Sequence, residues 1–315
     1  MKNTPFLFLL LFAGTLAAAA PSAPGPLPRP LREKPLRASA TRTLAPGVTY
    51  VAAHFDNLFG DGPVATHWLL IDWKTCAKDV SLNIARNPAQ RERPTTLAQA
   101  AHALACVNGT YHSMTDPSTP HFQLTVHGEL IPSKPGGGDG TLAFNDGEMP
   151  YIGHFSKNIL ETYANVISGD GVPGRGQPLP DYSDQSPEAR KKRAAARAPR
   201  TFAGNNITNR VTVIGVADGR QRHSIGVNYV ELRYLLECWG CDPGALVSLD
   251  GGGSTVMALR KDAEMEIVNI PSDGAPLKPT ERRVAESIQI LDGSQLPQPT
   301  SPAAPSKRGQ ISPTH

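Results

Sequence analysis

The sequence predicts an α+β fold: a single domain with a largely antiparallel, mixed sheet and a few packed helices. Three observations predict it. Apolar residues alternate with a period of two in several segments, short turn sequences join some of these segments, and only two segments carry the helical period of about 3.6 residues. Hairpins, rather than a regular alternation of strands and helices, favour an antiparallel sheet with helices packed on it.

The strand candidates are short and alternate between apolar and polar residues. Asp218-Gly219 predicts a hairpin turn after one of them, with a returning strand over residues 222–227, and Lys261-Asp262 predicts a second hairpin. The candidates in chain order are residues 64–72, 80–84, 211–216, 222–227, 255–259, 264–270 and 284–291.

Two segments are predicted to be helices. Residues 96–102 carry Leu97, Ala100 and Ala101 on one face, with Thr95 or Thr96 as the N-cap. Residues 228–239 carry four apolar residues at i, i+3, i+4 and i+7, and Gly240 follows as a C-cap. These four residues are Leu232, Leu235, Leu236 and Trp239.

The two ends of the chain differ in composition from its middle. Residues 1–20 combine Lys2, a short apolar run and small residues, which is typical of a cleaved signal peptide and predicts a periplasmic or secreted protein; an uncleaved membrane anchor is the alternative. The apolar run is too short for a membrane span. Residues 21–46 are interpreted as a linker rich in Pro and Arg, residues 47–292 as the domain, and residues 293–315 as a disordered tail rich in Pro, Ser and Thr.

The charge of the chain is small for its length. A formal net charge of +3 over 315 residues argues against nucleic acid as a main partner. One basic run is interpreted as a solvated helix or loop; the alternative functional interpretation is that it binds an anionic polymer. It consists of Arg190, Lys191, Lys192, Arg193, Arg197 and Arg200.

Four cysteines, Cys76, Cys106, Cys238 and Cys241, allow three disulfide pairings. The last two have CxxC spacing but follow a predicted helix, whereas a redox-active thiolate needs a helix N-terminus. Zinc would need two more ligands, and no second CxxC is present. A structural disulfide is therefore the prediction.

The stretch Leu249-Asp250-Gly251-Gly252-Gly253-Ser254-Thr255 is the main candidate for a functional site. An apolar strand leads into a carboxylate, three glycines and two hydroxyls. Such a turn places a charge at the end of a buried strand and lets a ligand approach the backbone. A flexible glycine turn with a chance aspartate is the alternative interpretation.

Five short motifs occur in a fixed order: Val107-Asn108-Gly109-Thr110-Tyr111, Ile167-Ser168-Gly169, Arg200-Thr201, the Asp250 stretch, and Glu281-Arg282-Arg283-Val284-Ala285. This pattern, over residues 47–291, resembles the phosphodiester glycosidase family, the domain of the mannose-6-phosphate uncovering enzyme, whose bacterial members are described as exopolysaccharide-related. The resemblance implies an α+β domain that hydrolyses a sugar-1-phosphodiester. It also implies functional roles for Asn108, Arg200, Asp250 and Arg282.

The sequence departs from the family pattern at three positions. Thr110 stands where the family has a second glycine, and His112 stands where it has an aromatic residue. Glu286 stands where the family often has Asn. These departures bear on the substrate more than on the fold.

The chemistry assigns roles to these residues. Phosphate suits the planar fork of arginine, which makes Arg200 and Arg282 the candidates. An oxocarbenium-like centre suits a carboxylate acting as nucleophile, base or electrostatic partner, which is Asp250. The candidates for substrate binding are Asn108 and Gly109, Thr201, the N–H groups of Gly251, Gly252 and Gly253, the hydroxyls of Ser254 and Thr255, and His112 as a proton donor near neutral pH.

Several alternatives stay open at this point. The second carboxylate could be Glu231, Glu281 or Glu286, each interpreted as a solvated surface acid. No cofactor is predicted, although Asp250 with Asp56, Asp72 or Asp170 offers oxygens to a cation such as Ca²⁺. The expected partner is a glycan or sugar phosphate, and no oligomeric state is predicted. An inactive carbohydrate-binding domain is the alternative, and a nucleotide hydrolase is disfavoured because the glycine turn lacks the lysine of a P-loop.

Overall fold

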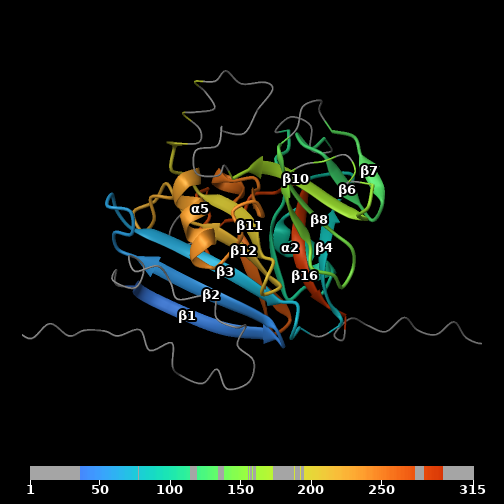
Figure 1. The fold of residues 1–315 in the computed structure, drawn as a ribbon, viewed down its shortest axis with the longest axis horizontal. Helices are drawn as coiled ribbons and strands as arrows, with labels where there is room; N and C mark the ends of the chain where they lie inside the picture. The colour runs from blue at the N-terminus through green and yellow to red at the C-terminus, as the bar shows by residue number, and fades with distance from the viewer. Residues whose placement is uncertain are drawn as a thin grey trace, which may run out of the picture.

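The computed structural model of this protein consists of two antiparallel sheets that pack face to face (Figure 1). It describes residues 36–76, 78–113, 119–133, 138–154, 156, 158, 161–172, 188, 192, 195–273 and 280–293. Every pairing between the described strands is antiparallel, so the predicted α+β class with a largely antiparallel sheet is confirmed.

The larger sheet has eleven strands. Their order is β1 (Leu36–Ala45), β2 (Val48–Phe55), β3 (Val64–Asp72), β12 (Val211–Ala217), β11 (Arg200–Asn206), β13 (Leu246–Ser248), β10 (Asn165–Gly171), β6 (Leu124–Val126) and β7 (Glu129–Ile131), while β8 (Gly140–Phe144) pairs with β10 and with β9 (Tyr151–His154). The smaller sheet has the order β15 (Glu264–Ile267), β14 (Met257–Lys261), β5 (Ala105–Asn108), β16 (Glu286–Asp292) and β4 (Val80–Arg86).

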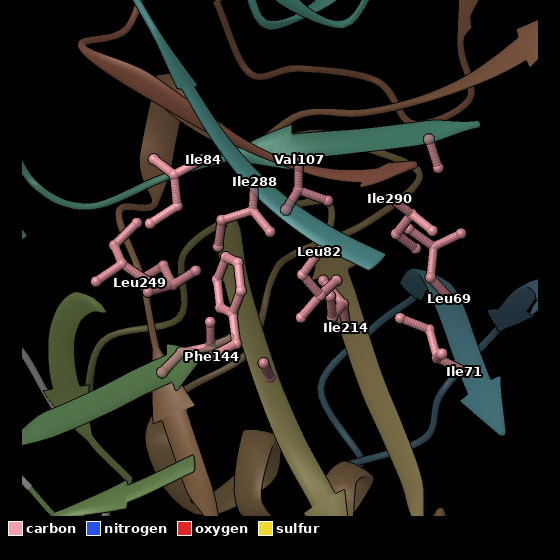
Figure 2. Packing of buried hydrophobic residues seen from close by; sticks show 14 of the residues in the cluster. Leu69, Ile71, Leu82, Ile84, Val107, Phe144, Ile214, Leu249, Ile288 and Ile290 are labelled. Atoms are coloured by element: carbon pink, nitrogen blue, oxygen red, sulfur yellow. The ribbon is translucent and has the colours of Figure 1, made fainter. Parts of the chain in front are cut away.

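The main core fills the space between the two sheets. Aliphatic side chains of the smaller sheet, among them Val107 and Ile288, face Phe144, Ile214 and Leu249 on the other side (Figure 2). The period of two in the strand sequences puts these side chains on one face of each sheet. Burial of each such side chain stabilises the fold by about 1.5–3 kcal/mol, so this layer holds the two sheets together.

Helix α5 (Tyr229–Cys238) covers the other face of the larger sheet, as Figure 1 shows. Its buried stripe of Leu232, Leu235 and Leu236 is the one that the sequence predicts. Asn228 caps the N-terminus by accepting from the N–H of Glu231, and Gly240 follows the helix with φ of +76°. The prediction of this helix is confirmed.

Helix α2 (Pro94–Ala100) covers the outer face of the smaller sheet, where Ala98 packs with Cys106 and Ala258. It begins two residues earlier than the sequence predicts, because proline serves as the first helical residue. The predicted threonine cap is wrong. Thr95 lies inside the helix and donates its N–H and hydroxyl to Glu281.

The hairpin predictions have opposite outcomes. Strands β14 and β15 form the predicted hairpin, with Asp262 in the left-handed region at φ of 55°. The returning strand predicted over residues 222–227 is wrong. Both edges of β12 are already paired, with β3 and β11, so no edge is free, and Val227 bridges to Ala198 instead.

The domain also begins earlier than predicted. Strand β1 pairs along β2, so residues 36–45 belong to the sheet and not to the linker assigned to residues 21–46. The predicted signal peptide, the rest of the linker and the tail after Gly293 lie outside the described residues, as do Arg190, Lys191 and Arg193. None of the described helices has the length and hydropathy needed to span a membrane.

All four cysteines are free thiols, so the predicted disulfide is not confirmed. Cys238 lies in the last turn of α5, and Cys241 follows after the left-handed Gly240. Burial raises the pKa of the Cys238 thiol to about 12 and also raises that of Cys241. Both thiols pack as small apolar groups in the layer beneath α5.

Candidate active site

Several strands of the larger sheet begin or end at the same end of that sheet. Strands β12 and β13 both run antiparallel to β11, so they run parallel to each other and end at the edge where β11 begins. Asp218 and Asp250 follow these two strands, Arg200 begins β11, and Asp170 pairs with Ser248. The fold therefore brings together charged residues that lie far apart in the sequence.

A different structural constraint disfavours a side chain at each of the three glycines in the Asp250 turn. A Cβ on Gly251 would lie 2.6 Å from the carbonyl oxygen of Pro199, and Gly252 has φ of +63°. A Cβ on Gly253 would collide with Asp273 and Arg282. The turn is thus clamped between the start of β11 and the segment before β16.

The backbone N–H groups of this turn are mostly used inside the protein. Gly251 donates to the side chain of Asp250, and Gly252 donates to the carbonyl oxygen of Pro199 at 2.9 Å. Ser254 and Thr255 donate to carbonyls of the same turn. The anion nest expected from Gly251, Gly252 and Gly253 therefore has two of its three donors engaged internally.

Asn108 ties the smaller sheet to the turn. Its amide nitrogen donates to the carbonyl oxygen of Asp250 at 2.8 Å. Its Oδ1 accepts from the Thr201 hydroxyl at 2.6 Å and from the N–H of Val256 at 3.2 Å. Asn108 and Thr201 are both fully buried, so they position the turn rather than face a ligand.

Arg200 points into the protein and is only 5 % exposed. Its guanidinium lies 4.5 Å above the ring of Tyr229 and donates to the carbonyl oxygens of Ala196 and Val227. Tyr229 in turn donates its hydroxyl to Asp170, which also accepts from Tyr111 at 2.7 Å. Arg200 therefore orders a buried network beneath the site.

Arg282 lies at the surface of the turn. Its Nε and Nη2 donate to Oδ2 of Asp273 at 2.8 and 2.6 Å, and its side chain is 31 % exposed. The ion pair covers Gly253, which explains why that position has no side chain. Arg282 is in the site, with its charge partly balanced by Asp273.

Asp250 is the accessible acid of the site, with its side chain 17 % exposed. His112 lies beside it, with 3.9 Å between Nδ1 and Oδ2 of Asp250. Burial, followed by the charge of Arg91, lowers the pKa of His112 to about 4. The ring is therefore neutral at pH 7, and the expected role of His112 as a proton donor near neutral pH is not supported.

Glu286 is the second carboxyl group at the site, and it is not the solvated acid that its sequence context predicts. It is 1 % exposed, and its Oε1 accepts from the N–H of Thr110 at 2.7 Å. Burial raises the pKa of Glu286 to about 8, and the charge of Asp250 also raises it. The hydrogen bond from Thr110 and the charge of Arg86 lower the pKa, but by less. Glu286 is thus protonated at pH 7, next to the turn that bears Asp250.

The other two acids lie elsewhere. Glu231 is buried on α5, where it binds Arg197 and caps the helix, while Glu281 binds Thr95. Asp72 caps its own turn by accepting from Lys74 and Thr75. In the described part of the chain, no group of three His, Cys, Asp or Glu is arranged to hold a metal ion.

Several buried polar atoms around the turn have no hydrogen-bond partner among the described residues. They include the hydroxyls of Ser254 and Thr255, Oε2 of Glu286 and both ring nitrogens of His112. Buried polar groups in folded proteins are nearly always paired, by protein, water or ligand. Their concentration around Asp250 marks this region as a place built to hold polar molecules.

Arg220 is a site residue to which sequence reasoning assigned no role. It follows the Asp218-Gly219 pair at the end of β12, and its guanidinium lies against Gly252. An arginine directly after a strand-ending Asp-Gly, near a second strand that ends in Asp, was the signal that could have found it.

The two-sheet fold thus presents a partly exposed carboxylate on a glycine turn with arginines against it, an arrangement suited to a hydrolase that acts on an anionic substrate. A model of the phosphodiester glycosidase family matches residues 101–291, and the chain belongs to this family. It is therefore an enzyme of the phosphodiester glycosidase type. No functionally curated protein matches the chain in sequence.

Solved structures share the fold at low sequence identity. The catalytic domain of zebrafish N-acetylglucosamine-1-phosphodiester α-N-acetylglucosaminidase, auto-inhibited by its pro-peptide, has a TM-score of 0.59 at 15 % identity, over 81 % of this chain and 87 % of that one. A protein from Burkholderia pseudomallei that is named "putative exported protein" has a TM-score of 0.59 at 13 % identity, over 87 % of this chain and 100 % of that one. A hypothetical protein from Synechocystis has 0.55 at 13 %, over 81 % and 64 %.

Proposed function

We propose that this enzyme hydrolyses a sugar-1-phosphodiester in an extracytoplasmic glycan and releases the sugar. The observation that carries the proposal is the Asp250 turn, where a partly exposed carboxylate is followed by glycines against which the guanidinium groups of Arg220 and Arg282 lie. The zebrafish relative, by its name, acts on such a phosphodiester. The apolar leader at residues 1–20 and the similar Burkholderia structure, which is named "putative exported protein", support the extracytoplasmic setting.

The leaving group explains why one accessible carboxylate suffices. In the proposed reaction a water oxygen bonds to C1 of the sugar, and the bond from C1 to the phosphate oxygen breaks. The electron pair stays on the phosphate, which leaves as an ionised phosphomonoester and needs little protonation. Asp250 stabilises positive charge at C1 and takes the proton of the attacking water.

The buried groups of the site have supporting roles in this proposal. Asn108 fixes the carbonyl of Asp250, and so holds the carboxylate in place. His112, neutral beside Asp250, adds no charge of its own next to that carboxyl group. The hydroxyls of Ser254 and Thr255 lack protein partners among the described residues but are fully buried, so we assign them, like Asn108, to holding the turn rather than to contact with the sugar.

The test is hydrolysis of a panel of sugar-1-phosphodiesters that differ in sugar and anomer. The expected result is release of the free sugar and a phosphomonoester by the wild-type protein. Asp250→Asn should remove this activity, while Asp262→Asn should keep it. Asp262 is a matched control because it is exposed in a left-handed turn that asparagine also tolerates. Absence of turnover with every diester, or full activity of Asp250→Asn, would contradict the proposal.

A further inference from the structure

The arginines around the Asp250 turn differ in what their guanidinium groups already bind. Arg200 donates to backbone carbonyls and stacks on Tyr229. Arg282 is engaged by Asp273 through both Nε and Nη2. A phosphodiester competing for either group would have to replace contacts that the protein already makes.

Arg220 is different, because it makes no hydrogen bond or ion pair to the described residues and its side chain is exposed. Its guanidinium nevertheless has a defined neighbour. A Cβ on Gly252 would lie 3.2 Å from Nη1, 3.6 Å from Nη2 and 3.7 Å from Cζ. The guanidinium group therefore lies within van der Waals distance of the space that a side chain on Gly252 would fill, two residues from Asp250.

The backbone that carries Arg220 is anchored on both sides. Asp218 accepts from the N–H of Ile270 at 3.0 Å and from the amide of Asn269 at 2.9 Å. Gln221 donates its side-chain amide to the carbonyl oxygen of Ile270 at 2.8 Å. Arg220 itself has φ of 60°, a conformation that costs free energy for a residue other than glycine. A strained turn held by these hydrogen bonds thus presents, next to Gly252, a cation that has no partner among the described residues.

We propose that Arg220 is the residue that binds the phosphate of the substrate, through its free N–H groups and the non-bridging phosphate oxygens. The planar fork of arginine matches two phosphate oxygens, and an unpaired guanidinium gives up no protein contact to bind them. Asp250 then faces the sugar side of the same bond. This inference rests on the proposed function and makes Arg220 a determinant of specificity for phosphodiesters over neutral glycosides.

The test compares Arg220→Gln with Arg222→Gln, which removes the same charge from an exposed arginine two residues away. With a sugar-1-phosphodiester that the wild type hydrolyses, kcat/KM should fall by about tenfold or more in Arg220→Gln, because a charge-assisted pair is lost, and stay near wild type in Arg222→Gln. Inhibition by inorganic phosphate should weaken in parallel. Arg220→Lys, which keeps the charge but not the fork, should lie in between.

The outcomes separate the two proposals. If the wild type hydrolyses phosphodiesters and the two glutamine variants behave alike, the assignment of Arg220 is wrong and the proposed function stands. If the wild type hydrolyses none, the proposed function is wrong, and calorimetric titration with inorganic phosphate still decides on Arg220. Weaker phosphate binding by Arg220→Gln than by Arg222→Gln supports the assignment, whereas equal binding overturns it. Unfolding midpoints of the variants verify that each is folded.

Discussion

Two aspartates follow strands β12 and β13, which lie on either side of β11 and end at the same end of the sheet, and the surroundings of the two aspartates are opposite. Asp218 is 1 % exposed and accepts from His223, from Asn269 and from the N–H of Ile270. Asp250 is partly exposed, and the histidine beside it has both ring nitrogens without a described partner. The carboxylate of Asp218 is enclosed by protein donors, and we call Asp218 and its partners the closed cluster; the carboxylate of Asp250 keeps contact with solvent, and we call Asp250 with His112 and Glu286 the open cluster.

The difference indicates what each cluster is for. A carboxylate whose oxygens are filled by protein donors contributes to stability, because every donor would otherwise be buried and unpaired. A carboxylate that keeps access to solvent, among polar atoms without partners, is available for chemistry. Residue type and sequence position do not separate the two aspartates, since each is a strand-ending Asp followed by Gly.

The largest expected effect is the loss of activity in Asp250→Asn. We expect kcat to fall by about a thousandfold, which is about 4 kcal/mol of transition-state stabilisation, because the amide neither accepts a proton nor balances positive charge. The unfolding midpoint should change little, since Asp250 is not a buried anchor. Kinetics with a sugar-1-phosphodiester and thermal unfolding measure the two quantities. If Asp250→Asn lowers the unfolding midpoint as much as Asp218→Asn does, the two aspartates do not differ in their contribution to stability.

The matched substitution Asp218→Asn is expected to act on stability. The new amide would point a donor at Ile270 or His223, which are donors themselves, so the free energy of unfolding should fall by about 2 kcal/mol. Denaturant unfolding measures this. Because the Asp218 turn carries Arg220, KM for a phosphodiester is also expected to rise. A thousandfold drop in kcat with unchanged stability would mean that the roles of the two aspartates are reversed.

Glu286 predicts a pH dependence for the open cluster. With its pKa raised to about 8, Glu286 ionises above that pH and adds a negative charge next to Asp250, which opposes binding of an anionic substrate. The kcat/KM of the wild type should therefore fall above pH 8. Glu286→Gln mimics the protonated acid, so this decline should be lost while activity at pH 7 stays within about threefold.

The same substitution has a consequence for stability. The folded state holds the Glu286 proton up to about pH 8, whereas the unfolded chain loses it near 4.5. The folded state therefore binds more protons between these values, and stability falls as pH rises through this window. Glu286→Gln should not show this decline, which unfolding experiments at pH 5 and pH 8 measure. Parallel pH profiles of the two proteins would exclude a buried, protonated Glu286.

The features that could be predicted from sequence are the local ones. The strand, acid and glycines around Asp250 are contiguous, as are the leucines and the cap of α5, so one window of sequence contains their physical cause. The two arginines expected to bind phosphate were also near the site, but their partners Tyr229 and Asp273 come from tertiary contacts.

The features that escaped prediction depend on pairings between distant segments. Glu286 is buried because β16 pairs with β5, with Ser287 opposite Asn108. The strand expected over residues 222–227 fails because β3 occupies the edge of β12. Neither strand pairing can be inferred from the residues next to it in the sequence, so a buried acid and a surface acid cannot be distinguished there.

The smallest expected effect tests the closed cluster through its exposed member. His223 donates to Asp218 at 2.9 Å, and its side chain is 26 % exposed. His223→Ala should lower the free energy of unfolding by about 1 kcal/mol, the net value of one hydrogen bond, because Asp218 keeps its donors from Asn269 and Ile270. Phosphodiester hydrolysis should be unchanged. The same substitution at His112 removes a buried ring beside Asp250, so it should lower the free energy of unfolding by about 2 kcal/mol or more through the cavity it leaves, and kcat should change as well. If His223→Ala instead reduces kcat more than His112→Ala does, then the closed cluster takes part in catalysis, and exposure to solvent is not what distinguishes the two aspartates.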